Sequence, residues 1–236
     1  MKAVQKLRKF SRSSNPQALP TRLRKKRFRL FEEMVNAIRE VETRPLSVGD
    51  FGGTAAYWDQ VYDMDRNPLN LNVTLINYRI EGETDDRFRY LEADVRDLAG
   101  MPENGFHICF SNSLIEHLGD LSVQAGVVRE MLRVSRYLYL QTPNRGFFWE
   151  PHYAMPFVHW LSLPRRMNVL SIVMGTSLTE QYDSYVGDPI RLLSRSELQY
   201  LFPTADFDHR AERIIGIAKS FVIRSRLLPA KQSATE

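Results

Sequence analysis

Apolar residues along the chain fall into two patterns, one with helical spacing and one in short continuous blocks. From about Thr21, six apolar positions fall near helical spacing and predict an amphipathic helix that packs on the main sheet: Phe28, Phe31, Met34, Val35, Ile38 and Val41. Pro45 breaks this pattern, because proline cannot continue a helix. The block 46–51 that follows ends in two glycines, which is typical of a buried strand leading into a tight turn.

Further apolar blocks predict strands at 73–78, 89–93, 107–110 and 137–140, followed by a last pair at 211–217 and 220–224. A helix over 195–201 is expected after Ser194. Strands that alternate with helical connections indicate a parallel sheet covered on both faces. The sequence therefore predicts an α/β, Rossmann-like fold with a seven-stranded, mostly parallel sheet, an N-terminal helix and an inserted aromatic helical segment. Ligands of such sheets bind at the carboxyl ends of the strands.

The 236 residues are 43% hydrophobic, which suits one domain over 21–236 preceded by a flexible arm over 1–20. The net charge of +4 is concentrated in that first part, because eleven lysines and arginines between Lys2 and Arg29 precede the first acid, Glu32. Such a basic segment can contact RNA phosphates or an anionic membrane. A solvated tail and an organelle transit segment are the alternatives.

Cys109 is the only cysteine, so an intramolecular disulfide and a cysteine metal cluster are excluded. The sequence has no apolar run of about 18 residues and no secretory h-region, so we expect a soluble, cytoplasmic protein. The five histidines are scattered and no His-Glu-x-x-His motif occurs, so no metal site is predicted.

Three polar segments follow predicted strands and carry the candidate chemistry. The turn Asp50-Phe51-Gly52-Gly53-Thr54 lets the backbone approach a ligand closely. Asp94 follows the third strand, where its carboxylate can accept from an adenine amino group or cap the next turn. In the third segment, 105–118, Ser113 and Glu116 match a capping box at the start of a helix, which favours a structural role for both.

The order of these motifs resembles the class I S-adenosylmethionine (SAM) dependent methyltransferases, especially the small-molecule enzymes related to ubiquinone-biosynthesis methyltransferases. The resemblance covers about residues 46–145. It is carried by Val48 to Thr54, Ala93 to Leu98, Phe110 to His117, Arg129 to Val134, and Gln141 to Arg145.

The resemblance implies that SAM is the cofactor and assigns its parts to residues of this chain. Asp50 with the Gly52-Gly53-Thr54 turn would hold the amino-acid end, Asp94 and Val95 would flank adenine, and Ser111 and Asn112 would line the floor. Two positions depart from the family pattern. The usual three-glycine turn is shortened or reordered, and Asn77 stands where an acid usually binds the ribose hydroxyls.

The sulfonium already activates the methyl group, so a base need only remove a proton from the acceptor. His117 is the candidate base, with a packed helix-surface histidine as the alternative. His152 and Tyr153 are candidate acceptor contacts. The strongly aromatic stretch from Phe147 to Leu161 predicts an acceptor-binding lid within 146–190, although a homodimer contact or an ordinary buried helix would show the same composition.

The sequence thus predicts a SAM-dependent methyltransferase that acts on the oxygen, nitrogen or carbon of a small molecule or biosynthetic intermediate. One alternative is an RNA methyltransferase whose basic residues 2–29 grip the phosphate backbone. Another is a non-catalytic cofactor-binding or scaffold protein of the same fold, suggested by the altered glycine turn and Asn77.

Overall fold

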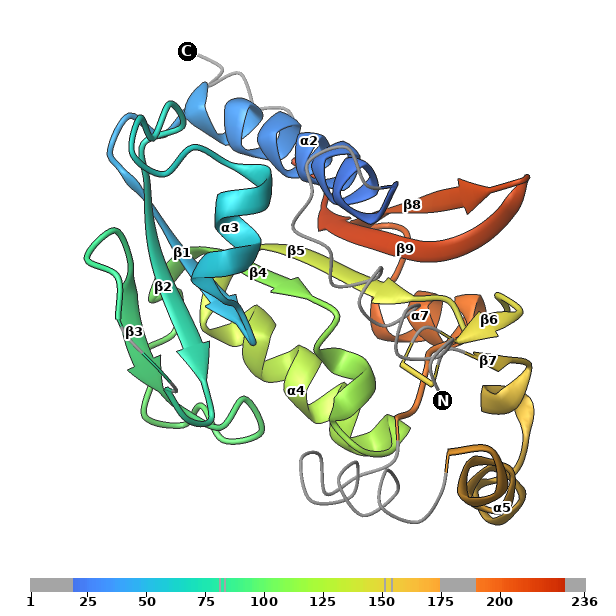
Figure 1. The fold of residues 1–236 in the computed structure, drawn as a ribbon. Coiled ribbons are helices and arrows are strands. Elements are labelled where there is room, and N and C mark those ends of the chain that lie inside the picture. Colours follow the sequence, from blue (N-terminus) through green and yellow to red (C-terminus); the bar gives the residue numbers. More distant parts are fainter. Residues whose placement is uncertain are drawn as a thin grey trace.

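Seven strands form one sheet in the order β3-β2-β1-β4-β5-β9-β8 (Figure 1). The computed structural model describes residues 19–80, 82, 84–150, 152–153, 155–174 and 190–227. The strands are β1 (Leu46–Phe51), β2 (Leu71–Asn77), β3 (Arg89–Glu92), β4 (Phe106–Asn112), β5 (Ser135–Pro143), β8 (Phe207–Ile214) and β9 (Ile217–Ser225). The first five are mutually parallel, and β9 runs antiparallel to both β5 and β8. The predicted mostly parallel, seven-stranded sheet is confirmed.

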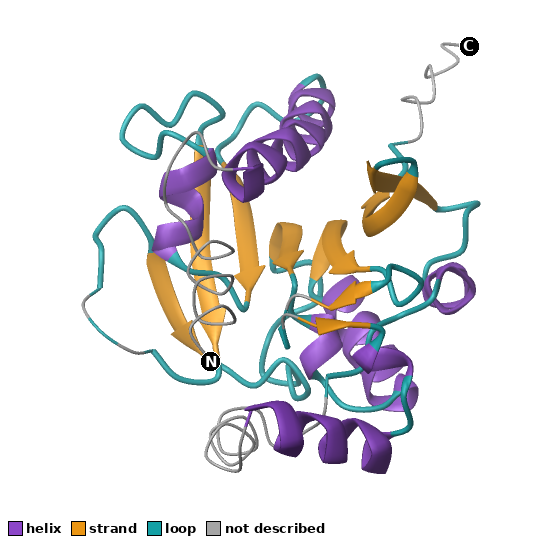
Figure 2. Ribbon diagram, turned by 45° about the vertical axis from the view of Figure 1, so that its right-hand side comes forward, coloured by secondary structure: helices purple, strands orange, loops and turns teal. Residues whose placement is uncertain are grey.

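Helices cover both faces of this sheet (Figure 2). On one face, α2 (Leu19–Arg39) and α3 (Ala55–Val61) pack over β1, β2 and β4. On the other face, α4 (Leu121–Arg133) and α7 (Arg195–Leu201) pack in a second apolar cluster. Beyond β5 lie a small hairpin of β6 (Trp149–Glu150) and β7 (Met155–Pro156), a 3₁₀ turn η2 (Val158–Trp160) and α5 (Leu163–Met174). This is the predicted Rossmann-like, three-layer architecture.

The N-terminal helix packs on the sheet through its apolar stripe, as predicted. Phe31 is fully buried and meets the rings of Phe110 and Tyr139 at centroid distances of 5.0 and 5.3 Å. The helix begins at Leu19 and ends at Arg39, so Val41, predicted as part of the stripe, is 67% exposed beyond its end. Residues 1–18 of the predicted arm, and 175–189 of the predicted lid, lie outside the described residues.

The last two strands are a hairpin whose boundary was predicted a few residues too late. Ile215 and Gly216 both have positive φ, 50° and 78°, and form the two-residue turn between β8 and β9. A strand over 211–217 would run through this turn. The left-handed backbone of these two residues suits the twist of a tight hairpin, and Gly216 is the residue of the pair whose type indicates a turn in the sequence.

The capping box predicted at Ser113 and Glu116 is wrong. Ser113 has φ 58°, whereas a capping residue needs an extended backbone, and its hydroxyl bonds to Gln141 Oε1 at 2.9 Å. The segment then makes a single 3₁₀ turn, η1 (Ile115–His117), and α4 begins later, capped by Asp120. A capping box does occur at Ser194 and Glu197, where the predicted helix α7 begins.

Within the described residues, the structure has no helix long and apolar enough to cross a membrane.

Replacing Phe31 with alanine should lower the free energy of unfolding by about 3–5 kcal/mol, because it removes a fully buried ring and leaves a cavity. Urea denaturation followed by circular dichroism measures this change. Val41→Ala, just past the same helix and largely exposed, should change it by less than about 0.5 kcal/mol. Equal effects of the two substitutions would contradict the packing of α2 on the sheet.

Candidate active site

Asp50, near the end of β1, is a buried carboxylate with one satisfied oxygen. Its side chain is 1% exposed, and Oδ2 accepts a hydrogen bond from Trp58 Nε1 at 2.8 Å. Among the described residues, Oδ1 has no hydrogen-bond partner. Burial raises the pKa of Asp50 to about 7, and the Trp58 hydrogen bond opposes this shift. The site therefore presents a carboxylate that needs a cationic or donor group from outside.

The turn after β1 is shaped by close contacts that only glycine permits. Gly52 has φ 76°, and its amide donates to Ile76 O at 2.8 Å. A Cβ on Gly53 would lie 1.9 Å from Asp50 Oδ2, far inside van der Waals contact. Thr54 then caps α3, because its hydroxyl accepts from Tyr57 N at 3.2 Å. Strand, turn and helix thus bring bare backbone against the Asp50 side chain.

The other predicted cofactor residues lie at the ends of β2, β3 and β4. Asn77 donates to Gly53 O at 2.9 Å, so it supports the glycine turn directly. The Asp94 carboxylate binds the Arg96 guanidinium at 2.8 Å, which holds the pKa of Asp94 below its usual value, and Val95 is buried in the core. Ser111 is buried, and its hydroxyl lies 3.5 Å from Phe51 O.

A cavity of about 450 Å³ opens beside the glycine turn. Asp50, Gly52, Gly53, Thr54 and Asn112 line it, so the structure brings these predicted residues together; Asp94, Val95 and Ser111 are not part of its lining. Residues that the sequence analysis did not single out complete the wall: Arg24, Ala56, Tyr57 and Gln60.

Arg24 reaches this cavity from α2, and its guanidinium donates to Gln60 Oε1 at 2.8 Å. Burial lowers the pKa of Arg24. In the sequence Arg24 stands among six basic residues within 22–29, so no local signal separates it from solvated neighbours. Only the docking of α2 beside α3 reveals it.

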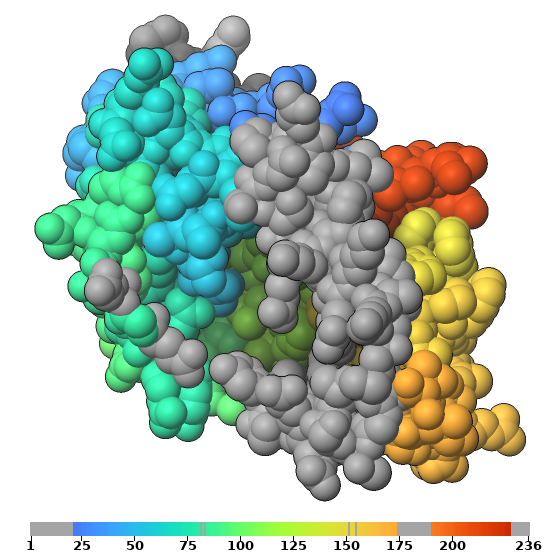
Figure 3. Space-filling view, in the orientation of Figure 1, coloured from blue at the N-terminus to red at the C-terminus, as the bar shows by residue number. Residues whose placement is uncertain are grey.

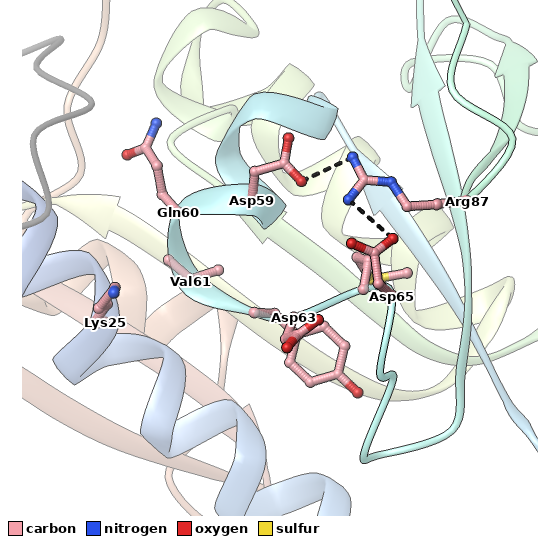
Figure 4. Close-up of a pocket in the computed structure, with 9 residues that line it drawn as sticks. Lys25, Asp59, Gln60, Val61, Asp63, Asp65 and Arg87 are labelled. Atoms are coloured by element: carbon pink, nitrogen blue, oxygen red, sulfur yellow. Dashed lines mark ion pairs between the residues drawn. The ribbon is translucent and has the colours of Figure 1, made fainter.

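A second depression, of about 360 Å³, lies beside α3 and is strongly charged (Figure 4). Arg87 bridges Asp59 at 3.0 Å and Asp65 at 3.7 Å across it. These acids are half exposed or more and are compensated by the guanidinium. We read this depression as an ion-pair network that ties α3 to the segment before β3.

Two histidines predicted as functional meet beyond the ends of β4 and β5. The His117 and His152 rings are perpendicular, with centroids 5.0 Å apart, and His152 Nδ1 lies 2.6 Å from Glu150 Oε1. Burial, followed by the charge of His152, lowers the pKa of His117 to about 4. The Glu150 carboxylate raises the pKa of His152 against the opposing effect of burial. Tyr153 is buried in a small apolar cluster, and its amide donates to Glu150 Oε2.

Glu116, once predicted to cap a helix, lies in the same cluster. It is fully buried, and Oε2 accepts from Thr142 Oγ1 at 3.2 Å. Burial raises the pKa of Glu116 to about 7. The chain thus gathers two carboxylates and two imidazoles at one edge of the sheet.

The aromatic segment after β5 is divided between core and surface. Phe147 and Val158 are buried, whereas Phe148, Phe157 and Trp160 are 40–50% exposed. The ring centroid of Phe157 lies 6.1 Å from that of Phe148 and 5.0 Å from that of Trp160. Residues from about 145 to 174 form a strip of surface below the β8–β9 hairpin (Figure 3, yellow to orange). Both sequence interpretations, buried core and apolar wall, apply to parts of this segment.

Comparison with known proteins assigns the first part of the domain. Residues 47–137 match the family described as Methyltransferase domain. No curated protein matches the chain. The segment that matches contains the glycine turn, the acid after β3 and the corner after β4.

The search of solved structures gives matches at low identity. A SAM-dependent methyltransferase from Methanosarcina mazei is 14% identical over 82% of this chain and 98% of its own, with a TM-score of 0.48. The 1,6-didemethyltoxoflavin-N1-methyltransferase of Burkholderia thailandensis is 14% identical over 81% and 75%, with a TM-score of 0.47. The chain spans 66% of a Bordetella parapertussis protein and 56% of a Burkholderia thailandensis O-methyltransferase family protein.

The family match and the strand order together define a class I SAM-dependent methyltransferase domain. A domain of this kind uses SAM as its methyl donor. The cavity fits this cofactor, because the unpartnered Asp50 oxygen is suited to an ammonium group and Gly53 leaves the backbone bare beside it.

Replacing Gly53 with alanine should displace the Asp50 carboxylate, because the new methyl group cannot share its space. We expect a loss of about 1–3 kcal/mol in the free energy of unfolding and a weaker SAM complex. Thermal denaturation and calorimetric SAM titration measure the two effects. Gly100→Ala is the matched control, since a Cβ there meets nothing within 4 Å. Wild-type behaviour of Gly53→Ala would refute the tight turn.

Asp50 should make the SAM-free protein less stable as pH rises. Its folded pKa, about 7, is above the unfolded value, so the folded state favours the protonated acid, and stability is lost as pH rises from about 4 through 7. Asp50→Asn keeps an acceptor for Trp58 and removes the titration. Between pH 5 and 8 the variant should gain on the order of 2–4 kcal/mol relative to wild type in urea denaturation. Parallel pH profiles would contradict the shifted pKa.

Proposed function

We propose that this enzyme transfers the methyl group of SAM to an oxygen, nitrogen or carbon atom of a small molecule or biosynthetic intermediate. The observation that carries the proposal is the cavity beside Gly52 and Gly53, with the buried, unpartnered Asp50 oxygen in its wall. On the motif from Phe110 to His117, we place the chain with the small-molecule group that resembles the ubiquinone-biosynthesis methyltransferases.

The residues that would hold SAM are those at the carboxyl ends of β1 to β4. Asp50 would pair with the ammonium group, and the backbone of Gly52, Gly53 and Thr54 would bind the rest of the amino-acid end. Asn77, braced on Gly53 O, would take the ribose with one donor and one acceptor. Asp94 and Val95 would flank adenine, and Ser111 and Asn112 would form the floor. When bound, SAM supplies a methyl group already activated by its sulfonium.

On the acceptor side, the cluster after β4 and β5 would receive the proton of the nucleophile. His117 is neutral at pH 7 because its pKa is about 4, which makes it available but weakly basic. His152 is oriented by Glu150 and has a raised pKa, so it is the stronger base of the two for removing the proton of the acceptor. The geometry therefore favours His152 over His117 as the base.

The segment 146–190 would bind the acceptor. Phe148, Phe157 and Trp160 expose three neighbouring rings, and Trp160 Nε1 is fixed on Arg145 O at 2.7 Å. Such a surface favours an acceptor with an apolar or ring-containing part. Tyr153, buried beneath this segment, would act by supporting Glu150 through its amide.

The basic segment 2–29 supports an RNA substrate less strongly once the contacts of its described residues are considered. Arg27 is 11% exposed and pairs with Glu212 at 3.2 Å, and Arg24 lines the cavity. These two cations therefore contact other parts of the fold and do not form part of an exposed basic surface. The exposed cations on α2 are Arg22, Lys25, Lys26 and Arg29. Residues 2–18 lie outside the described residues.

Calorimetric titration with SAM and its demethylated product tests the proposal. Wild type should bind both with one site per chain, and Asp50→Ala should lose at least about tenfold in affinity, because a charged hydrogen bond is lost. Asp59→Ala is the control, because Asp59 lies on α3 and pairs with Arg87 but does not line the cavity. No binding by wild type, or equal affinities in the two variants, would refute the assignment of the cavity.

A further inference from the structure

The side-chain cluster beyond β4 and β5 contains one feature that base catalysis leaves unexplained. Glu116 is fully buried, yet its Oε1 atom has no hydrogen-bond partner among the described residues. An unsatisfied buried oxygen costs about 1–3 kcal/mol, so it calls for a water, an ion or a ligand. Glu116 enters this position from η1, and Thr142 at the end of β5 holds only its other oxygen.

The groups around Glu116 have the composition of a metal site. Ligand atoms of Glu116, His117 and His152 all lie within 4.8 Å of one another. Two ligands of a zinc-sized ion, each about 2.1 Å from it, are separated by at most about 4.2 Å. Small side-chain rotations would therefore bring the three groups into coordination distance.

The hydrogen bond of His152 supports the same reading. Its Nδ1 is bound to Glu150 Oε1 at 2.6 Å, and Glu150 is itself fully buried and held by the Tyr153 amide. Metal-binding histidines commonly use one ring nitrogen for the ion and donate the other to a carboxylate, which fixes the tautomer and the ring orientation. Because Nδ1 faces Glu150, coordination of a metal by His152 would use Nε2.

We propose that Glu116, His117 and His152 bind a divalent transition-metal ion, with Glu150 orienting His152. Two imidazoles and a carboxylate suit zinc or iron(II) better than magnesium, which prefers oxygen ligands. Three protein ligands leave a position open for water or for an oxygen of the acceptor.

This site departs from the expectation of no metal drawn from the sequence. Glu116 and His117 are adjacent in the chain, but His152 comes 35 residues later and after β5, so no local motif joins the three. The hairpin of β6 and β7, whose turn contains His152, brings them together. With the ion bound, His152 could not also act as the base, because the same ring nitrogen would coordinate the metal. The proposal does not depend on SAM binding, because the ligands lie outside the lining of the cavity beside the glycine turn.

Metal titration of the tag-free, chelator-stripped full chain tests the proposal, with Zn²⁺ and Mg²⁺ followed by calorimetry and Co²⁺ by its visible absorption. Wild type should bind one Zn²⁺ or Co²⁺ per chain and bind Mg²⁺ far more weakly. Glu150→Gln should weaken Zn²⁺ binding about 10–100-fold. Glu116→Gln and His152→Asn should weaken it further.

His209→Asn is the matched control, because His209 bonds to Phe202 O and takes no part in the cluster. It should bind like wild type. Melting curves of the stripped proteins identify any variant that fails to fold, and Glu150→Gln then remains as the informative substitution. Absence of a site in wild type, or equal affinities in His152→Asn and His209→Asn, would overturn the proposal. SAM titration of the stripped protein is a separate readout, so failure of the metal site and failure of the cofactor site are distinguishable.

Discussion

The contact between the Asp50 carboxylate, the Trp58 indole and the bare Cα of Gly53 is the constraint around which the domain is arranged. Trp58 is fully buried and joins α3 to the aromatic cluster beneath α2 through Phe28 and Phe31. Its indole Nε1, the single polar atom of the side chain, donates to Asp50 Oδ2. The same carboxylate is therefore both a structural acceptor for the core and part of the wall of the cavity beside the glycine turn. Burial favours the protonated form of Asp50, so the free energy cost of desolvating its charge is already part of the folded state before any cation binds.

Much of the sheet could be predicted because parallel, fully buried strands appear as continuous apolar blocks bounded by turns. This pattern predicts β1, β4 and β5. The helix after Ser194 is indicated by a residue type that commonly caps helices. The corner after β4 was predicted wrongly, because Ser-x-x-Glu at 113–116 matches the sequence pattern of a capping box but does not form one. The left-handed backbone of Ser113 and the partner Gln141, 28 residues away, decide its structure, and neither can be read locally.

For the site, sequence patterns identified the groups that follow each strand, since topology sends those positions to one edge. Five predicted cofactor residues line one cavity, and Asn77 braces it. Arg24 and the convergence of Glu116 with His152 could not be predicted, because they depend on how α2 and the β6–β7 hairpin return to the sheet. Local motifs therefore described the cavity beside the glycine turn better than the side-chain cluster after β4 and β5.

The helix α2 is also held by the last two strands of the sheet. Arg27 pairs with Glu212 on β8, and Arg224 on β9 donates to Leu30 O at 3.0 Å. Both strands follow α2 by more than 150 residues in the sequence, so they are synthesised long after it. The docking of α2, and with it the Arg24 wall of the cavity beside Gly52 and Gly53, can therefore be completed only after β8 and β9 have been synthesised.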